Sequence, residues 1–372
     1  MTRIKVGIVG CGWVSDWHVR DGIRENAEEF ELLACCDTDI NKTNEFAARH
    51  GVPRATTDYR AMYAMADVEA VIICTPPDSH YNLVIDALAA GKFVICEKPL
   101  TSSLALVDAL QLAEHASLGK VMPIFQYRFG NGIAKIKQLI QSGILGRAYV
   151  STIETAKSRD QEYYKTPWRG KFATELGGVL LTQAIHIHDL FQWLMGPISL
   201  VSASKATRVN PIEVEDCAVA NLVMADGSLA AITATLGSVG ELVRIRLCFE
   251  KATLELSAKD SDTKHPGDCD WLIAARSEEM RRIIDSKMKE VPMNAAGFAR
   301  QYQLFHEAYV SQSQMPVTLK DARCSLELIT AMFHSAETGT AVRLPLSSDH
   351  LRYRGWLPDA VRHAPRPIKA MS

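Results

Sequence analysis

The sequence predicts an α/β protein of two domains, and three observations lead to this prediction. The chain has 372 residues, whereas a single hydrophobic core rarely grows beyond about 250–300 residues. In the first part of the chain, short apolar runs typical of buried strands alternate with helices, which favours a doubly wound parallel sheet. After Gln126 strands predominate, and hairpin signals such as Asp226-Gly227 favour antiparallel pairing. We therefore expect a first domain of residues 1–123 with a parallel sheet. A second α/β domain of residues 124–372 should carry an open, mainly antiparallel sheet.

Composition argues against several classes of protein. The formal net charge is −2, so we expect neither a nucleic-acid partner nor a membrane surface as partner. Nine cysteines are scattered without a CxxC pair or a Cys/His cluster of zinc spacing, which predicts reduced, mostly buried thiols and no metal. The chain begins with a strand and shows neither a signal-peptide pattern nor a long apolar run. A cytoplasmic location is the resulting expectation.

A glycine-rich turn follows the first predicted strand, residues 4–9. Gly10 suits a tight turn, Gly12 allows close backbone approach to a pyrophosphate, and the small Ser15 lets helix and strand pack. The next strand, residues 31–36, ends at Asp37, 25 residues after Gly12, against about 20 for the acidic residue that binds the adenosine ribose. A carboxylate there favours NAD and repels the 2′-phosphate of NADP. We therefore interpret residues 1–123 as a nucleotide-binding domain.

The remaining elements of the first domain alternate in the same way. Helices are predicted over residues 40–50, 59–65, 79–90 and 101–117, and strands over residues 70–74, 93–96 and 121–125. The strand at 93–96 is followed by Glu97, Lys98 and Pro99. Ligands of doubly wound sheets bind beyond the carboxyl ends of the strands, so this charged pair stands where chemistry is expected. Pro99 restricts the backbone of Lys98 and limits how the lysine is presented.

The second domain is predicted to contain more strands than helices. Strands are expected over residues 147–157, 200–207, 217–224, 228–236, 243–249 and 253–257, and helices over residues 133–142, 179–195, 296–311 and 321–338. Residues 261–270 are polar and predict a loop, and a Pro-rich tail ends the chain.

One face of the predicted helix 179–195 carries a second group of residues that could take part in catalysis. Thr182, His186 and Asp189 are spaced i, i+4 and i+7, which places them on one face. A carboxylate one turn from a histidine could orient its ring, as a histidine general base requires. His188 points roughly 160° away from His186 by helical periodicity, so it is the weaker candidate.

Together these motifs make the chain similar to the Gfo/Idh/MocA family of nicotinamide-dependent oxidoreductases. The resemblance covers essentially the whole chain. It is carried by GIVGCGWVSDWH at the start, CTPPDSH at 74–80, EKP at 97–99, QYRF at 126–129 and GGVLLTQAIHIHDLFQWLMG at 177–196. The family typically has a Rossmann domain followed by an α/β domain whose open sheet often forms dimer or tetramer contacts. The resemblance thus implies a homodimer or homotetramer.

The resemblance also implies roles for individual residues. Lys98 would be the lysine near the nicotinamide and the reacting carbon, and His186 the usual acid/base. The cofactor, NAD rather than NADP, would contact Gly10, Gly12, Trp13, Val14, Asp37, Thr75, Pro76, Pro77, His80, Glu97 and Lys98. The substrate would contact Lys98, Arg128, Trp168, Arg169, Thr182, Gln183 and His186. Tyr163 and Tyr164 lie in the same loop as Arg169 and could stack on a sugar or hydrogen-bond to it.

One position departs from the family pattern. Many dehydrogenases of the family have an Asp four residues before the catalytic histidine, whereas this chain has Thr182. Threonine can hydrogen-bond a substrate hydroxyl but cannot shift the pKa of the histidine as a carboxylate would. We expect an NAD-dependent dehydrogenase that oxidises a secondary hydroxyl of a sugar, anhydrosugar or cyclitol. An NAD-retaining glycoside hydrolase, a non-catalytic dinucleotide sensor, and a reductase of a non-sugar carbonyl or imine are the alternatives.

Overall fold

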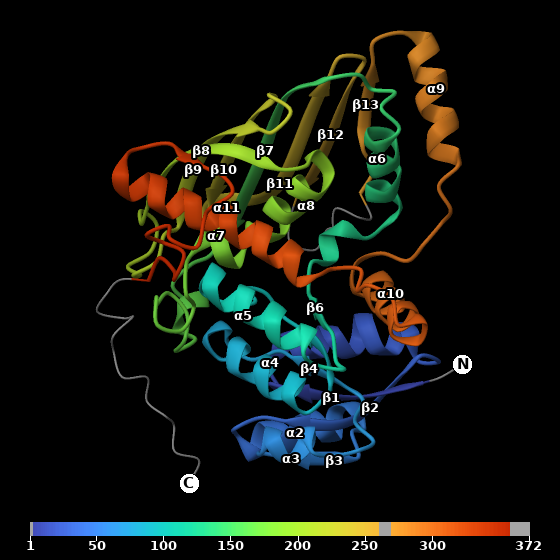
Figure 1. Cartoon of the computed structure of the whole chain (residues 1–372), viewed down its shortest axis with the longest axis vertical. Helices are drawn as coiled ribbons and strands as arrows, with labels where there is room; N and C mark the ends of the chain where they lie inside the picture. Colours follow the sequence, from blue (N-terminus) through green and yellow to red (C-terminus); the bar gives the residue numbers. More distant parts are fainter. Residues whose placement is uncertain (1–2, 260–268, 358–372) are drawn as a thin grey trace.

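The structure is a computed structural model that describes residues 3–259 and 269–357. It contains two sheets, which lie in the lower and upper halves of Figure 1. The first sheet is parallel throughout, as the sequence predicts. Its strands in spatial order are β3 (Arg54–Thr56), β2 (Phe30–Cys36), β1 (Ile4–Val9), β4 (Ala70–Ile73), β5 (Phe93–Cys96) and β6 (Val121–Pro123). The short edge strand β3 was not predicted.

Helical segments flank the parallel sheet and connect its strands. They are α1 (Trp13–Trp17), continued by η1 (His18–Ile23) and η2 (Arg24–Asn26), then α2 (Ile40–His50), α3 (Tyr59–Tyr63), η3 (Pro77–Ser79), α4 (His80–Ala89) and α5 (Leu104–His115). Asp39 caps α2 by accepting hydrogen bonds from two backbone N–H groups, and Gly51 ends it in the left-handed conformation. The predicted alternation of strand and helix is therefore confirmed.

The second sheet is mixed, and among the described residues it has eight strands. In spatial order they are β13 (Leu272–Ala275), β12 (Ala252–Lys259), β11 (Gly237–Phe249), β7 (Ala148–Ser158), β10 (Leu229–Thr235), β9 (Cys217–Met224), β8 (Ile198–Ala206) and β14 (Val342–Arg343). Neighbouring strands are antiparallel except β7 and β10, which are parallel. The mainly antiparallel sheet is confirmed, and only the short strands β13 and β14 were not predicted.

Helices cover one face of the second sheet (Figure 1). The segments that follow the first domain are η4 (Gln126–Arg128), α6 (Asn131–Gln141), η5 (Tyr163–Lys165), α7 (Val179–Thr182), α8 (Ile185–Met195), α9 (Glu278–Lys289), α10 (Gly297–Ser311) and α11 (Leu319–Thr338). Helix α11 packs along β8, and α8 packs on β7. Helix α10 returns to the first domain, where Tyr302 packs against Phe30 and His18.

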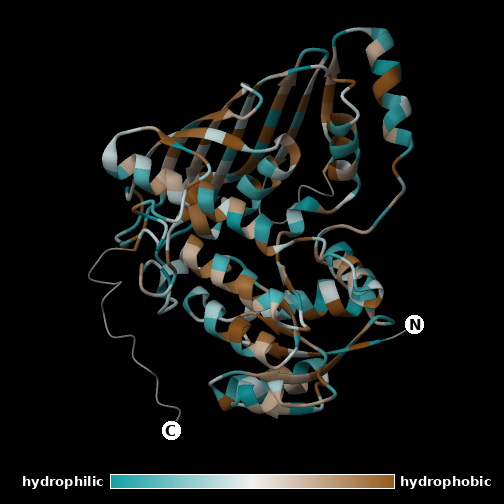
Figure 2. Cartoon of the chain, viewed as in Figure 1, coloured by the Kyte–Doolittle hydropathy of each residue, from teal (hydrophilic) through white to brown (hydrophobic). Residues whose placement is uncertain are grey.

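Two helices of the second domain differ from the sequence-based prediction. The helix predicted over residues 179–195 is broken into α7 and α8 at Gln183-Ala184, so that prediction was wrong in its continuity. Helix α9 was not predicted, because it is strongly polar and buries only Met280 and Ile284. Hydrophilic residues, coloured teal, recur along this helix in Figure 2. The predicted loop at 261–270 lies largely outside the described residues, and the Pro-rich tail begins near their end.

Candidate active site

The glycine-rich turn after β1 has the shape that a dinucleotide needs. Gly10 has φ +93°, and a Cβ atom there would lie 2.8 to 2.9 Å from the backbone of Cys74 and Thr75, so only glycine fits. Gly12 faces open space, because a Cβ atom at this position would meet nothing within 4 Å. The helix that starts at Trp13 directs its first backbone N–H groups, which have no intrahelical acceptor, toward this turn.

Asp37 stands at the end of β2 next to the turn. One carboxylate oxygen accepts from Cys11 N at 2.9 Å, and the other accepts from Asp39 N at 3.1 Å. These bonds fix the carboxylate beside the glycine-rich turn, where it can accept from ribose hydroxyls. The open space at Gly12, the helix start and the fixed carboxylate therefore fit NAD.

The loop after β4 carries further residues that we predict to contact the cofactor. Thr75 and Ser79 share a hydroxyl hydrogen bond of 2.6 Å, and Pro77 begins η3. His80 is buried, and its ring nitrogens lie 2.8 Å from the carbonyl oxygens of Thr75 and Pro99. The histidine thus joins the loops after β4 and β5, and its predicted contact with the cofactor stays a prediction.

Lys98 follows β5 at the carboxyl edge of the parallel sheet, and the Lys98–Pro99 peptide bond is cis. Its Nζ donates to the carbonyl oxygen of Thr182 in the second domain at 2.7 Å. Burial lowers the pKa of Lys98, whereas the neighbouring carboxylate of Glu97 acts to raise it. An ammonium group has three N–H donors, so Lys98 can hold Thr182 and still donate to a substrate oxygen.

Glu97 is held by residues that the sequence motifs did not assign to the site. One oxygen lies 3.0 Å from His18 Nε2, and the other accepts from Lys98 N at 3.1 Å. His18 Nδ1 in turn lies 2.6 Å from the hydroxyl of Tyr302 on α10. Burial acts to raise the pKa of Glu97, but the contacts with His18 and Lys98 together hold that pKa below its ordinary value. Glu97 therefore remains a carboxylate beside Lys98. His18 belongs to the GIVGCGWVSDWH stretch, so the signal was present in the sequence.

His186 lies on the first turn of α8 with its side chain largely buried. Its ring stacks on Tyr127 of η4, with centroids 4.8 Å apart and an interplanar angle of 27°. Phe125 meets the same ring edge-on at 6.5 Å. These aromatic contacts limit the orientations of the imidazole.

The predicted role of Asp189 as the group that orients His186 needs correction. Asp189 accepts from Nε and Nη2 of Arg128 at 2.6 Å each, and from the hydroxyl of Ser325 at 3.0 Å. Nη1 of Arg128 donates to Asp321 at 3.0 Å. Because Arg128 is buried and all three of its nitrogens are engaged, we assign both Arg128 and Asp189 to the framework of the second domain.

Thr182 and Gln183 lie at the break between α7 and α8. The Thr182 hydroxyl donates to the carbonyl of Gly178 at 2.9 Å, so toward a substrate it can only accept. Its backbone carbonyl is the group that contacts Lys98. Gln183 donates to the hydroxyl of Tyr163 at 3.2 Å and accepts from Arg159 at 3.4 Å. The break therefore joins Lys98 to the loop of residues 158–169.

That loop lines a cavity of about 420 Å³ together with Trp13 from the glycine-rich turn. Arg169 lies over the rings of Tyr163 and Trp168, at 3.9 and 4.3 Å from their centroids. Arg159 lies on the same cavity and pairs with Glu241 at 2.6 Å. The cavity thus lies between the predicted cofactor turn and the predicted substrate loop.

Comparison with known proteins agrees with this geometry. Residues 4–124 match the family described as "Oxidoreductase family, NAD-binding Rossmann fold", and residues 133–255 match the "GFO/IDH/MocA C-terminal domain". The chain belongs to the Gfo/Idh/MocA family. It is an NAD-dependent oxidoreductase with a Rossmann domain, as its sequence led us to expect.

Relatives within the Gfo/Idh/MocA family match the chain over nearly its full length. D-glucoside 3-dehydrogenase of Escherichia coli is 26% identical over 369 residues, covering 92% of this chain and 97% of the relative. The uncharacterized oxidoreductase YrbE of Bacillus subtilis is 29% identical, covering 94% and 97%. The crystal structure of the WlbA dehydrogenase from Bordetella pertussis in complex with NADH and UDP-GlcNAcA aligns with a TM-score of 0.82 and 26% identity, covering 93% of this chain and 99% of that one.

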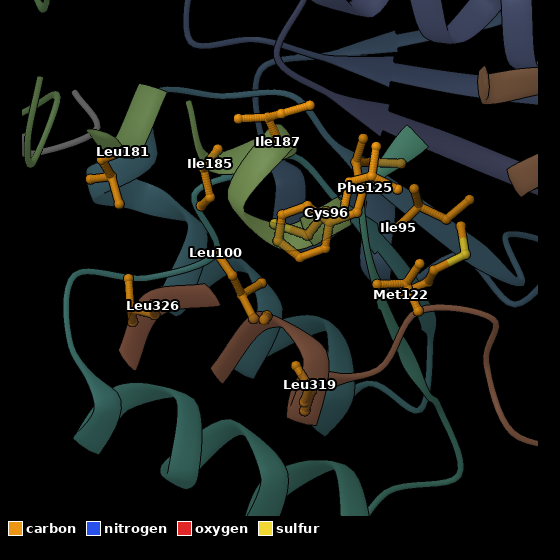
Figure 3. Close-up of a cluster of buried hydrophobic side chains, with 14 of the residues drawn as sticks. Ile95, Cys96, Leu100, Met122, Phe125, Leu181, Ile185, Ile187, Leu319 and Leu326 are labelled. Carbon is orange, nitrogen blue, oxygen red and sulfur yellow. The ribbon is translucent and has the colours of Figure 1, made fainter. Parts of the chain in front are cut away.

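A continuous apolar layer supports the two halves of this Gfo/Idh/MocA site (Figure 3). Ile95 and Cys96 of β5 lie in the same buried cluster as Phe125, Ile185 and Ile187. Lys98 and His186 therefore project from elements that share one core, although they belong to different domains.

No helix in the described part of the chain is long and apolar enough to span a membrane. Residues 3–259 and 269–357 also contain no cluster of three or more His, Cys, Asp or Glu side chains suited to a metal ion.

Proposed function

We propose that the protein is a dehydrogenase that oxidises a secondary hydroxyl of a sugar, anhydrosugar or cyclitol to a ketone, with NAD as the hydride acceptor. The observation that carries the proposal is the Lys98–Thr182 hydrogen bond of 2.7 Å. It joins the strand end of the cofactor domain to the turn that precedes His186. The relatives named as D-glucoside 3-dehydrogenase and myo-inositol 2-dehydrogenase support this class of substrate.

In the proposed reaction Lys98 orients the substrate hydroxyl and stabilises the alkoxide that develops on it. Its ammonium is already fixed by Thr182 and flanked by the carboxylate of Glu97, so little reorganisation is needed when charge develops. His186, held by its stack on Tyr127, accepts the hydroxyl proton as general base. The bound dinucleotide supplies the hydride acceptor. We further propose that Thr182 and Gln183 contact the substrate at the break between α7 and α8.

The test is NADH formation, measured at 340 nm, with NAD or NADP and a panel of sugars, sugar acids, anhydrosugars and inositols. We expect turnover with NAD on one of these classes and its near-complete loss in Lys98→Met. Glycoside cleavage without net NADH would instead indicate the hydrolytic alternative. Dinucleotide binding with no turnover of any polyol, carbonyl or imine would indicate the sensor.

We also propose that the protein assembles as a homodimer or homotetramer through the uncovered face of the second sheet. Val150 and Leu229 are neighbours on adjacent strands, and Val219 lies one strand further; all three side chains are about half exposed. Exposed apolar groups on one sheet face favour contact with another copy. Light scattering coupled to size-exclusion chromatography should give a dimer or tetramer mass, and Val219→Lys with Leu229→Lys should lower it.

A further inference from the structure

Leu176 has a backbone conformation that leucine rarely adopts. Its φ is +70°, and it ends a single helical turn in which the N–H of Glu175 donates to the carbonyl oxygen of Lys171 at 2.9 Å. Glycine or asparagine is the usual residue at such a position, because a Cβ atom crowds the backbone there. The leucine is also buried, with 2% of its surface exposed. A conformation of this kind persists only where other contacts hold it.

Trp356, near the end of the described chain, supplies such a contact. Its Nε1 donates to the carbonyl oxygen of Leu176 at 2.8 Å, across 180 residues of sequence. The indole is buried and stacks on Phe333 of α11, with ring centroids 5.2 Å apart and an interplanar angle of 28°. Because α11 fixes the ring, the N–H points in one direction, and the peptide bond after Leu176 must meet it there.

The segment that carries this tryptophan also binds the first domain. The hydroxyl of Tyr353 donates to Asp108 of α5 at 2.5 Å, and its carbonyl accepts from a backbone N–H in the first turn of that helix. At Gly355 the chain passes so close that a Cβ atom would lie 2.9 Å from the carbonyl oxygen of Ser102, in the loop that follows β5. Residues 353–357, which we call the clasp, therefore contact both domains.

The chain between Leu176 and the site is short and fixed at several points. Two residues after Leu176, the N–H of Gly178 donates to the side chain of Glu215 at 3.0 Å. Helix α7 follows directly and ends at Thr182, whose carbonyl oxygen accepts from Nζ of Lys98 at 2.7 Å. Of the two contacts that hold the chain ahead of α7, the one from the tryptophan comes from the clasp. The clasp thus connects α7 to the domain that carries the lysine.

We propose that Trp356 is a positioning residue for the reaction. Its indole N–H holds Leu176 in the left-handed conformation, and this keeps the carbonyl of Thr182 at the ammonium group of Lys98. The rest of the clasp fixes the arrangement relative to the first domain, from which the lysine projects. The inference rests on the proposed function, because its main consequence is the rate of turnover at Lys98.

The first variant is Trp356→Phe, which keeps an aromatic ring against Phe333 but removes the N–H donor. We expect kcat to fall about 10- to 100-fold, as for a small misplacement of a catalytic group by a distant substitution. The dissociation constant for NADH should stay unchanged, since the predicted cofactor contacts belong to the first domain. Arg352→Gln is the matched control, because it removes an ion pair with Glu337 of α11 one residue before the clasp. Its kcat should match that of the wild type.

A rescue experiment separates the conformation of Leu176 from its packing. Leu176→Gly and Leu176→Ala remove nearly the same buried side chain, but only glycine adopts a positive φ at no cost. In the Trp356→Phe background, kcat should be about 5- to 30-fold higher with glycine than with alanine, the ratio expected for a Cβ atom in the left-handed conformation. With Trp356 in place, the hydrogen bond holds either residue, so the ratio should be close to one. Equal kcat of the two double variants would overturn the proposal.

Hydrogen exchange measured by mass spectrometry tests the same contact without any substrate. In Trp356→Phe, peptides that cover residues 176–186 should exchange faster, while peptides from β1 and β2 keep the exchange of the wild type. Unchanged exchange at residues 176–186, or a uniform rise across both domains, would overturn the positioning role, as would a wild-type kcat in Trp356→Phe. If the wild type oxidises no sugar or cyclitol, a local rise in exchange would still support the contact between Trp356 and Leu176. In that case the dehydrogenase alone would be refuted.

Discussion

The buried carboxylate of Glu215 should make the stability of this protein depend on pH in a way that one substitution removes. Its two oxygens each lie 3.0 Å from the backbone N–H of Gly178, and one also accepts from Leu180 N at 3.2 Å. Burial raises the pKa of Glu215 from 4.5 to about 7, although these N–H groups and Lys205 act to lower it. The folded state therefore favours the protonated form more than the unfolded state does.

Because of this difference, ionisation of Glu215 lowers the free energy of unfolding. Glu215 stabilises the fold fully below pH 4.5, and the contribution is lost as the pH rises through about 7. At 1.36 kcal/mol for each pH unit, the loss over that interval is about 3 kcal/mol. Glu215→Gln mimics the protonated side chain at every pH. The free energy of unfolding of the wild type, relative to this variant, should fall by about 3 kcal/mol between pH 4.5 and 7.5.

Urea unfolding at half-unit pH steps measures this difference directly. Glu213→Gln is the control, because Glu213 is exposed and also accepts from a backbone N–H, that of Phe172 at 3.1 Å. This control variant tests whether the loss of a carboxylate from residues 213–215 by itself changes how the free energy of unfolding depends on pH. A difference between wild type and Glu215→Gln that stays constant with pH would refute the reasoning about burial.

Three further predictions concern the site and its framework. His186→Ala should lower kcat by roughly 10²–10⁴-fold while the dissociation constant for NADH, measured by fluorescence, stays unchanged; unaltered turnover would remove His186 from the proposed role. Asp37→Ser should raise the ratio of kcat/KM for NADP to that for NAD by about 10- to 100-fold, because a like charge next to the 2′-phosphate is removed. A ratio that does not move would place the ribose elsewhere. Asp189→Asn should lower the free energy of unfolding by about 3–5 kcal/mol, since it leaves Arg128 buried with a broken ion pair; denaturation that matches the wild type would contradict that role.

The first domain was more predictable from the sequence than the second. Its strands and helices follow from local signals, and Gly10 is required by a turn that the motif itself describes. The break at Gln183-Ala184 has no comparable local signal. The start of α7, ahead of this break, is held by Glu215, which accepts hydrogen bonds from Gly178 N and Leu180 N from more than 30 residues away in the chain. A Cβ at Gly178 would lie 1.7 Å from the Glu215 carbonyl oxygen, so this close approach explains why residue 178 is glycine. Helix α9 was missed because its polar surface shows few apolar positions.

The QYRF and HIHD motifs contribute two pairs of side chains to the contact between η4 and α8. Tyr127 and His186 form one pair across this contact, and Arg128 and Asp189 form the next. Because the second pair is buried and bidentate, it fixes η4 against α8 and so determines where Tyr127 meets the histidine ring. We therefore expect Asp189 to influence His186 through the position of Tyr127, a route that helical spacing alone could not reveal. It follows that Asp189→Asn should disturb the Tyr127–His186 stack as well as stability, so kcat should fall even where the variant is fully folded.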